Sequence, residues 1–222
     1  MARRIGIADL AGVVYSSGKV FNGLSTGRLD TENFLRSGSL SGIASRSDLA
    51  LLEDLRDVAS LIIEHADRPV NAAFVRQINA QITRTGALHP GQFRTSEQQI
   101  GVNTRYGRHT PDAVTDDALQ HLIEQATASP DREENALDLF IEIAKAQPFE
   151  DGNKRTALFA ANCLLLGADT GTLLVVPVDE HDPTLSEQFN DLLARAYLED
   201  DHAGVKALLR TRGLVDIDSR KE

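Results

Sequence analysis

The sequence predicts an all-α fold with one small β-hairpin. Apolar residues recur at helical spacing along most of the chain, whereas the stretch 91–111 is too glycine-rich and too weakly periodic for a helix. The run 157–165 is apolar nearly all round, as expected of a helix buried on every side. A chain of 222 residues with 41% hydrophobic content is long enough for one domain with a substantial core. We therefore expect one helical bundle around a buried central helix.

The ends of the chain are expected to lie outside this domain. Residues 1–29 are rich in glycine and serine with only short apolar pieces, which favours an irregular arm. The domain itself is expected over 30–212, with 213–222 as a tail. Its first helix is predicted at about 30–36, where Gly38 is a typical stop.

Two longer helices follow. The first is predicted to reach about residue 65, because leucine, valine and isoleucine recur on one face, and Ser47 or Asp48 is the expected cap. The second is predicted over 70–85, where apolar residues recur four apart and Gly86 is the stop signal.

The stretch 91–111 predicts a loop with a short hairpin at about 93–108, and a short strand is expected at 171–176. The remaining helices are predicted at about 115–128, 132–146, 153–166, 184–198 and 201–212.

Charge and composition exclude several classes of protein. A net charge of −10 argues against a general nucleic-acid binder, which needs cations to neutralise phosphates. The single cysteine, Cys163, excludes an internal disulfide and is expected to be an inert core thiol. No stretch approaches the ~18–20 apolar residues of a membrane span, and the short apolar run after residues 1–4 is interrupted by Asp9. We expect a cytoplasmic protein without a membrane or nucleic acid as partner.

The stretch 147–157, Gln-Pro-Phe-Glu-Asp-Gly-Asn-Lys-Arg-Thr-Ala, predicts an anion-binding loop that opens a helix. Backbone N–H groups at a helix N-terminus favour a phosphate. Lys154 and Arg155 would add point-charge and bidentate contacts to that phosphate. Asp151 is the type of ligand that Mg²⁺ takes beside a polyphosphate. The plainer alternative is a helix N-terminus at which Asp151 only favours the dipole.

Residues 147–155 resemble the signature of the Fic/Doc (fido) family, His-Pro-Phe-x-Asp/Glu-Gly-Asn-Gly/Lys-Arg, with Gln147 in place of the catalytic histidine. Two further segments are similar to that family in the expected order. The residues around 91–111 resemble its flap, and Ala194–Asp201 resembles its C-terminal Ala-Tyr run. The resemblance covers roughly 30–212 and implies the fido fold, with the hairpin over the motif loop.

The resemblance implies a role for each motif position. Asp151 would hold Mg²⁺, and Arg155 would bind the phosphates of ATP as the co-substrate. Gly152, Asn153 and Lys154 would form the nest for those phosphates.

The resemblance also assigns roles outside the phosphate nest. Phe149 would fix the loop in the core, and Arg94, Ile100 and Gly101 would belong to a flap that binds a target protein by strand addition. The alternative that Arg94 is simply a solvated side chain stays open. His89 and His109 flank the hairpin and are the histidines most able to approach the site.

The implied activity is AMP transfer from ATP to a Ser, Thr or Tyr hydroxyl of a protein. Gly152 and the long flap-bearing chain favour AMP transfer, whereas Lys154, with Leu158 where the AMP branch carries a second arginine, resembles the phosphate-transferring Doc branch. Residues Ser17–Asn22 resemble the family's inhibitory motif only weakly, with Phe21 in place of its glutamate. A third alternative is a catalytically silent binding module in a toxin–antitoxin-like pair, with an antitoxin or inhibitory partner.

Gln147 bears directly on activity. In the family, the motif histidine is the general base, and glutamine cannot take a proton at neutral pH. A positioned base contributes ~10²–10⁴-fold, so we expect impaired or absent transfer. Positioning and charge stabilisation can leave a residual rate, and nucleotide binding should outlast catalysis. Whether Gln147 is natural or was introduced by design stays open at this point.

Overall fold

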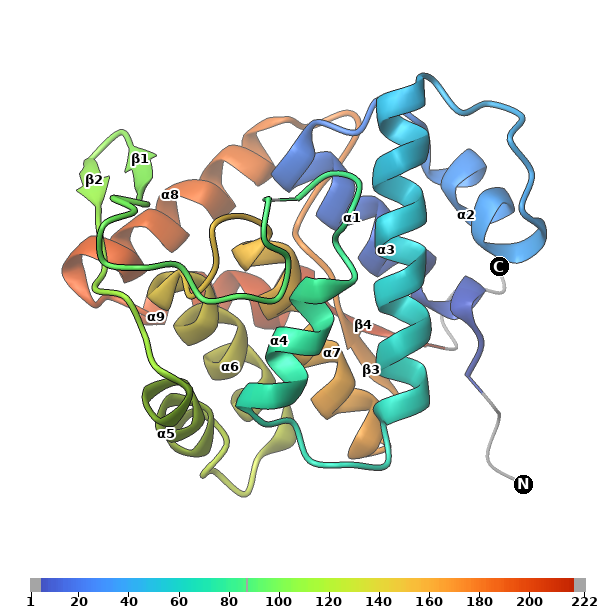
Figure 1. Cartoon of the computed structure of the whole chain (residues 1–222). Helices are drawn as coiled ribbons and strands as arrows, with labels where there is room; N and C mark the ends of the chain where they lie inside the picture. Colours follow the sequence, from blue (N-terminus) through green and yellow to red (C-terminus); the bar gives the residue numbers. More distant parts are fainter. Residues whose placement is uncertain (1–4, 87, 218–222) are drawn as a thin grey trace.

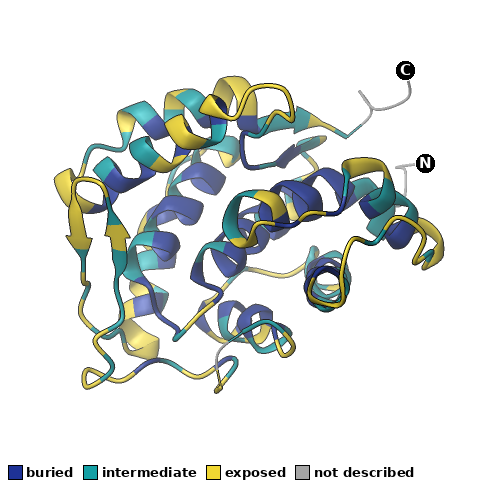
Figure 2. Cartoon of the chain, turned by 90° about the horizontal axis from the view of Figure 1, so that it is seen from above, coloured by how far each residue is buried: buried dark blue, intermediate teal, exposed yellow. Residues whose placement is uncertain are grey.

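Helix α7 (Asn153–Gly167) is the centre of the molecule. Eleven of its fifteen residues are buried, and α6, α3, α4, α1 and the strand β3 all contact it. In the computed structural model it runs behind α4 in the middle of the bundle (Figure 1), and the view from above shows that buried residues gather in the interior of the helical bundle (Figure 2). The prediction of a helical bundle around this helix is therefore confirmed.

The structure describes residues 5–86 and 88–217, and its helices match most of the predicted ranges. No helix in that part of the chain is long and apolar enough to cross a bilayer. The helices are η1 (Ile7–Leu10), α1 (Ala11–Asn22), α2 (Arg28–Ser37), α3 (Arg46–His65), α4 (Ala72–Ala80), α5 (Asp116–Ala126), α6 (Arg132–Ala146), α7, α8 (Thr184–Glu199), α9 (Ala203–Leu208) and the π-helical turn η2 (Leu209–Gly213).

Side-chain caps explain where several helices begin. The hydroxyl of Ser45 accepts from the backbone N–H of Asp48 at 3.0 Å and caps α3, and Asn71, Thr115 and Asp131 cap α4, α5 and α6 in the same way. The prediction of Ser47 or Asp48 as the cap of α3 was wrong. Asp48 lies inside the first turn, where its carboxylate accepts from both the N–H and the hydroxyl of Thr26.

The N-terminal segment is not an irregular arm, as the sequence had suggested. It forms α1, whose residues from Ala11 to Gly18 are all buried. The small residues that lower helix propensity are the ones that allow close packing: a Cβ added at Gly18 would lie 3.0 Å from Leu24 Cδ2, and the Ser16 hydroxyl accepts from the N–H of Val176 at 3.0 Å. Tertiary burial has overridden local propensity here.

Two short antiparallel sheets complete the fold. The predicted hairpin consists of β1 (Val102–Thr104) and β2 (Gly107–His109), with Val102 opposite His109, and it stands beside α8 (Figure 1). The predicted strand is β3 (Thr172–Leu174). Its partner is β4 (Leu214–Asp216), so residues 214–216 of the expected tail are part of a sheet that packs against the core, while 218–222 lie outside the described residues.

Helix α4 is shorter than the predicted 70–85, since it ends at Ala80. The following residues make backbone hydrogen bonds to an acidic side chain instead of continuing the helix. The N–H groups of Thr83, Arg84 and Thr85 all donate to the carboxylate of Asp54 in α3.

Asn162 joins the central helix to β3, and it provides a test of this packing. Its amide donates to the carbonyl of Leu174 at 2.8 Å and accepts from the N–H of Leu174 at 2.9 Å, with no exposed surface. Asn162→Ala leaves two buried backbone groups unpaired and should lower the free energy of unfolding by about 2–6 kcal/mol. Urea unfolding measures this. Asn190→Ala, an exposed change in α8, should stay within about 0.5 kcal/mol of wild type; equal effects would contradict the assigned role.

Candidate functional site

The motif loop between α6 and α7 is built on two left-handed residues. Gln147 ends α6 with φ 47° and ψ 55°, and Gly152 precedes α7 with φ 75°. Such conformations cost roughly 1–3 kcal/mol for a residue other than glycine, so the surrounding contacts must stabilise the turn. They reverse the chain tightly enough to place the N-terminus of α7 beside the end of α6.

Asn153 closes this loop on itself. Its Oδ1 accepts from the N–H of Phe149 at 2.8 Å, and its Nδ2 donates to the Phe149 carbonyl at 2.9 Å and to Gln147 Oε1 at 3.1 Å. Phe149 is 1% exposed and stacks on Phe93 with ring centroids 5.7 Å apart. Asn153 is thus buried and occupied by the loop, so its amide fixes the shape of the loop.

Asn79 of α4 ties the loop to the neighbouring helix, and sequence analysis missed it. Its Nδ2 donates to the Asp151 carbonyl at 2.9 Å and to Thr156 Oγ1 at 3.1 Å, and its Oδ1 accepts from the N–H of Gly91 at 2.8 Å. One buried amide therefore joins the loop, α7 and the start of the hairpin segment. A lone asparagine in an amphipathic helix gives no sequence signal for this role.

Gln147 is held at both ends of its amide. Its Nε2 donates to the Ala144 carbonyl and its Oε1 accepts from Asn153, while its own carbonyl accepts from Arg94 Nε at 2.6 Å. The side chain lines the cavity described below but is only 6% exposed. At this position glutamine stabilises the left-handed turn and supplies no proton acceptor.

Arg94 attaches the hairpin segment to the loop. Besides the Gln147 carbonyl, its guanidinium donates to the carbonyls of Pro111 and Asp112 at 2.6 and 2.7 Å, and its N–H donates to the Pro148 carbonyl at 3.0 Å. It is 4% exposed. The alternative of a solvated side chain was therefore wrong, because the Nε–H and Nη2 groups of Arg94 donate to internal carbonyls, while its place in a target-binding flap stays a prediction.

A cavity of about 330 Å³ opens between this loop, the hairpin and the end of α1. Ile100 and Gly101, expected in the flap, lie in its wall. The motif contributes Gln147, Glu150, Asp151, Gly152, Asn153, Lys154 and Arg155, and the other sides are formed by Phe21, Asn22, Val102 and Asn103.

Lys154 is the cation most available to a ligand in this cavity. Its Nζ lies 4.9 Å from the centroid of the Phe21 ring, and within residues 5–86 and 88–217 no carboxylate lies within ion-pair distance of it. Burial lowers the pKa of Lys154, and the charge of Asp151 opposes that shift. An anion in the cavity would stabilise the ammonium form.

Arg155 is more deeply buried, at 2% exposure. Its guanidinium donates to Thr85 Oγ1 at 2.8 Å and to the Thr85 carbonyl at 3.0 Å, and it lies 3.4 Å from Asp151 Oδ2. Burial lowers the pKa of Arg155 as well, opposed by Asp151 and Asp54. With Lys154 it forms a cationic wall at the start of α7.

The residues of this site suit a metal ion that Asp151 and a bound ligand would coordinate together. They do not suit a metal ion coordinated by protein side chains alone. The carboxylate of Asp151 is exposed, and its Oδ1 accepts from the N–H of Gly152 at 2.6 Å. The described part of the chain has no cluster of three metal-binding side chains. Mg²⁺ commonly takes one or two carboxylates with phosphate oxygens and water, so Asp151 suits that mode.

A second cavity of about 260 Å³ adjoins the first and lies between the hairpin and α8. The two share Val102, Asn103 and Lys154. Tyr197 lines the second cavity, and its buried hydroxyl has no hydrogen-bond partner among the described residues. The pair of cavities therefore has a cationic end and an end with an unused hydroxyl.

Neither histidine beside the hairpin lines these cavities. His89 pairs with Glu150 at 3.2 Å. His109 has its Nε2 at 2.7 Å from the carbonyl of Lys145 and packs on Tyr197. The described residues around the first cavity thus include no histidine.

Residues 69–165 match the sequence model of the Fic/DOC family, and this stretch contains the loop, the hairpin and all but the end of α7. This part of the chain thus has the sequence pattern of the Fic/DOC family. The match indicates nucleotide transfer in general terms. No curated protein matches the sequence.

Solved Fic-domain structures share the fold of this chain. A Fic domain-containing signaling protein from Bacteroides thetaiotaomicron is 19% identical, with TM-score 0.68, covering 90% of this chain and 80% of that one. Fic-1 from C. elegans is 16% identical, with TM-score 0.66 and coverage of 90% and 58%. A Fic family protein from Desulfovibrio desulfuricans G20 is 14% identical, with TM-score 0.64 and coverage of 92% and 63%. The chain thus spans less than two thirds of the latter two.

Gly152, the glycine of this loop, should tolerate substitution less well than Gly171, which lies outside the loop. A Cβ there would lie 2.9 Å from Ile82 Cδ1 and 3.1 Å from Asn79 Nδ2, whereas Gly171 has nearly the same φ of 74° with nothing within 4 Å. Gly171→Ala should cost only the left-handed conformation, about 1–2 kcal/mol, and Gly152→Ala about 1–3 kcal/mol more through crowding. Chemical denaturation of both variants measures the difference; equal losses would show that the contact with α4 is soft.

Proposed function

We propose that this chain binds ATP with Mg²⁺ in the paired cavities and belongs to the protein adenylyltransferases, with the transfer step slowed or stopped by Gln147. The observation that carries the proposal is the pair Lys154 and Arg155 at the start of α7, where Lys154 lacks a carboxylate partner among the described residues. Helix N-termini favour phosphate, and buried cations favour it further.

The two ends of the paired cavities suit the two ends of a nucleotide. The phosphates would lie against Lys154, Arg155 and the backbone of Gly152, with Mg²⁺ shared between them and Asp151. The nucleoside would occupy the adjoining cavity, which Tyr197 lines. Mg²⁺ would supply charge stabilisation on the phosphate oxygens.

The acceptor would be a hydroxyl of a protein segment laid along the hairpin. Strand β1 pairs only with β2 in the described residues, so a short edge is available for strand addition. Ile100 and Gly101, in the wall of the phosphate cavity, would lie next to that segment.

The type of transfer depends on which phosphorus faces the acceptor. Leu158 is 1% exposed and lies in the core, so the position of the family's second arginine gives this cavity no cation. That feature favours the alternative of Doc-like phosphate transfer, whereas Gly152 and the long chain favour AMP.

A silent module that binds nucleotide or a partner such as an antitoxin is the second candidate function. It is favoured by the engagement of Gln147 in two internal hydrogen bonds.

Binding should depend on Lys154. Its replacement by alanine removes a charge-assisted contact worth about 1.5–3 kcal/mol, so Lys154→Ala should weaken ATP·Mg²⁺ roughly 10- to 150-fold. Calorimetry measures this, with Lys19→Ala, an exposed lysine outside both cavities, as the matched control. Chelating Mg²⁺ should weaken wild type further. Equal affinity of wild type and Lys154→Ala would remove the phosphate site from this cavity.

Restoring a base should restore transfer. Histidine tolerates the left-handed conformation of position 147 and is largely neutral at pH 7, so Gln147→His should raise transfer by about 10²–10⁴-fold. Gln147→Ala is the control, because it loses the same amide contacts without gaining a base. ATP labelled at the α or γ phosphorus, incubated with the chain and a cell lysate, distinguishes AMP from phosphate transfer.

The Gln147→His variant also distinguishes a transferase from a catalytically silent binding module. A folded Gln147→His variant that binds ATP and yet leaves neither label on protein would reject the lost-base account and leave the binding module as the better description.

A further inference from the structure

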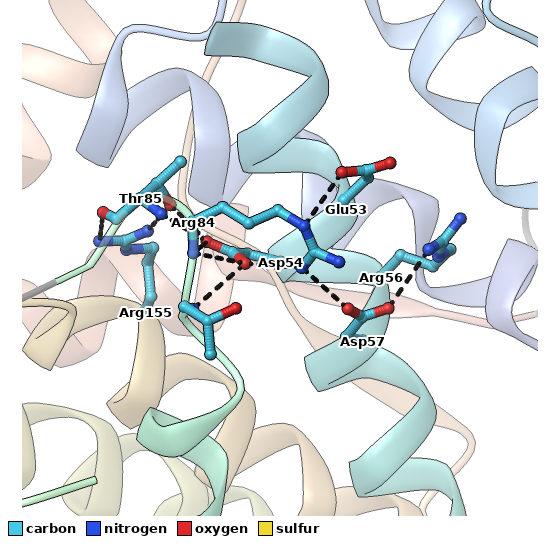
Figure 3. A network of polar contacts seen from close by, with 8 residues as sticks. Glu53, Asp54, Arg56, Asp57, Arg84, Thr85 and Arg155 are labelled. Carbon is cyan, nitrogen blue, oxygen red and sulfur yellow. Dashed lines mark hydrogen bonds and ion pairs between the residues drawn. The ribbon is translucent and has the colours of Figure 1, made fainter. Parts of the chain in front are cut away.

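Asp54 in α3 is a fully buried carboxylate that the proposed mechanism does not use. It is 0% exposed, and every hydrogen bond it accepts comes from the turn after α4. Its oxygens accept from the backbone N–H groups of Thr83, Arg84 and Thr85 at 2.8–3.2 Å, from Thr85 Oγ1 at 2.8 Å and from Arg84 Nη1 at 3.0 Å (Figure 3).

This number of donors is what a buried charge requires. An unpaired carboxylate in the core costs several kcal/mol, and hydrogen bonds together with an ion pair offset that cost. The ion-pair partner, Arg84, reaches the surface and also contacts Glu53 and Asp57. Hydrogen bonding to Asp54 raises the pKa of Arg84. The turn 83–85 is therefore fixed against α3 by Asp54.

Thr85 faces the site from the other side of the same turn. Because its hydroxyl proton is donated to Asp54, its oxygen lone pairs are free to accept from Arg155 Nη1 at 2.8 Å. Its carbonyl accepts from Arg155 Nη2 at 3.0 Å. Arg155 donates to Thr85 and Thr85 donates to Asp54, and Figure 3 shows these contacts in a row.

These contacts also determine how much of Arg155 remains for a ligand. A guanidinium has five N–H groups. Two donate to Thr85 and one to Asp151, so the Nε–H and one Nη1–H remain. The guanidinium is planar and is held at both Nη1 and Nη2, so the directions of the two remaining N–H groups are fixed, which lowers the entropy lost when a phosphate binds.

We propose that Asp54 and Thr85 are positioning residues for Arg155, fixing its guanidinium so that a remaining N–H group meets a phosphate group in the cavity. The inference rests on the proposed function, in which Arg155 binds nucleotide phosphates. Neither Asp54 nor Thr85 lines that cavity, so both act through Arg155.

The test compares threonines within one turn. Thr85→Val removes the hydroxyl that joins Arg155 to Asp54 and should weaken ATP·Mg²⁺ about 3- to 10-fold. Thr85→Ser retains the hydroxyl and should restore affinity. Thr83→Val is the matched control, because Thr83 is exposed and only its backbone reaches Asp54; it should bind as wild type does. Arg155→Ala marks the affinity without the guanidinium, and thermal unfolding of each variant verifies folding. Thr85→Ala replaces Thr85→Val if the latter does not fold.

A second readout needs no nucleotide. In the free protein, nuclear magnetic resonance of the Arg155 guanidinium should show separate, slowly exchanging Nη protons in wild type, Thr83→Val and Thr85→Ser. Those signals should average in Thr85→Val and in Asp54→Asn. Unchanged signals and unchanged affinity in folded Thr85→Val would overturn the inference.

The two readouts separate the inference from the proposed function. If wild type and Arg155→Ala both fail to bind ATP·Mg²⁺, the proposed function fails, and the resonance measurement alone then decides whether Thr85 and Asp54 orient Arg155. If Arg155→Ala loses binding while Thr85→Val does not, the function stands and the positioning role is wrong.

Discussion

The burial of α7 on nearly every side is the constraint on which the site depends. Since α1, α3, α4, α6 and β3 cover the helix, its first turn is the part that meets the cavity. That turn carries the free N–H groups and the positive end of the helix dipole. A buried helix cannot shift without exposing apolar surface, so the position of the cationic wall is set by the core.

The loop before α7 needs support because it contains two left-handed residues. Asn153 bonds to the loop internally, Asn79 bonds it to α4, and Arg94 bonds it to the hairpin segment. Each of these polar side chains is at least nine-tenths buried and satisfies two or more backbone groups. Such networks are costly when incomplete and rigid when complete, which is why the loop keeps one shape without a ligand.

The burial of the first turn of α7 also affects the two cations at the site. Burial lowers the pKa of both Lys154 and Arg155, so their charged forms are stabilised less than in water. Arg155 is compensated by Thr85 and Asp151, whereas Lys154 lies against the Phe21 ring and has no carboxylate within ion-pair distance among the described residues. An anion in the cavity would neutralise the charge of Lys154. Gln147, fixed by its own hydrogen bonds, adds shape to this cavity and no proton acceptor.

The sequence alone determined the features that depend on neighbours three or four residues apart. These are the helices with a regular apolar face, the non-helical stretch 91–111 that contains the hairpin, and the loop 147–155 with its cations at a helix start. Only the tertiary structure decided that the glycine and serine residues of α1 form a buried helix, that residues 214–216 pair with β3, and that Arg94 binds carbonyls. It also selected Asn79 and Thr85, whose bonds to Asp151 and Arg155 cross 72 and 70 residues of sequence. No local pattern encodes such bonds, because they exist only after the core has brought α4 and α7 together.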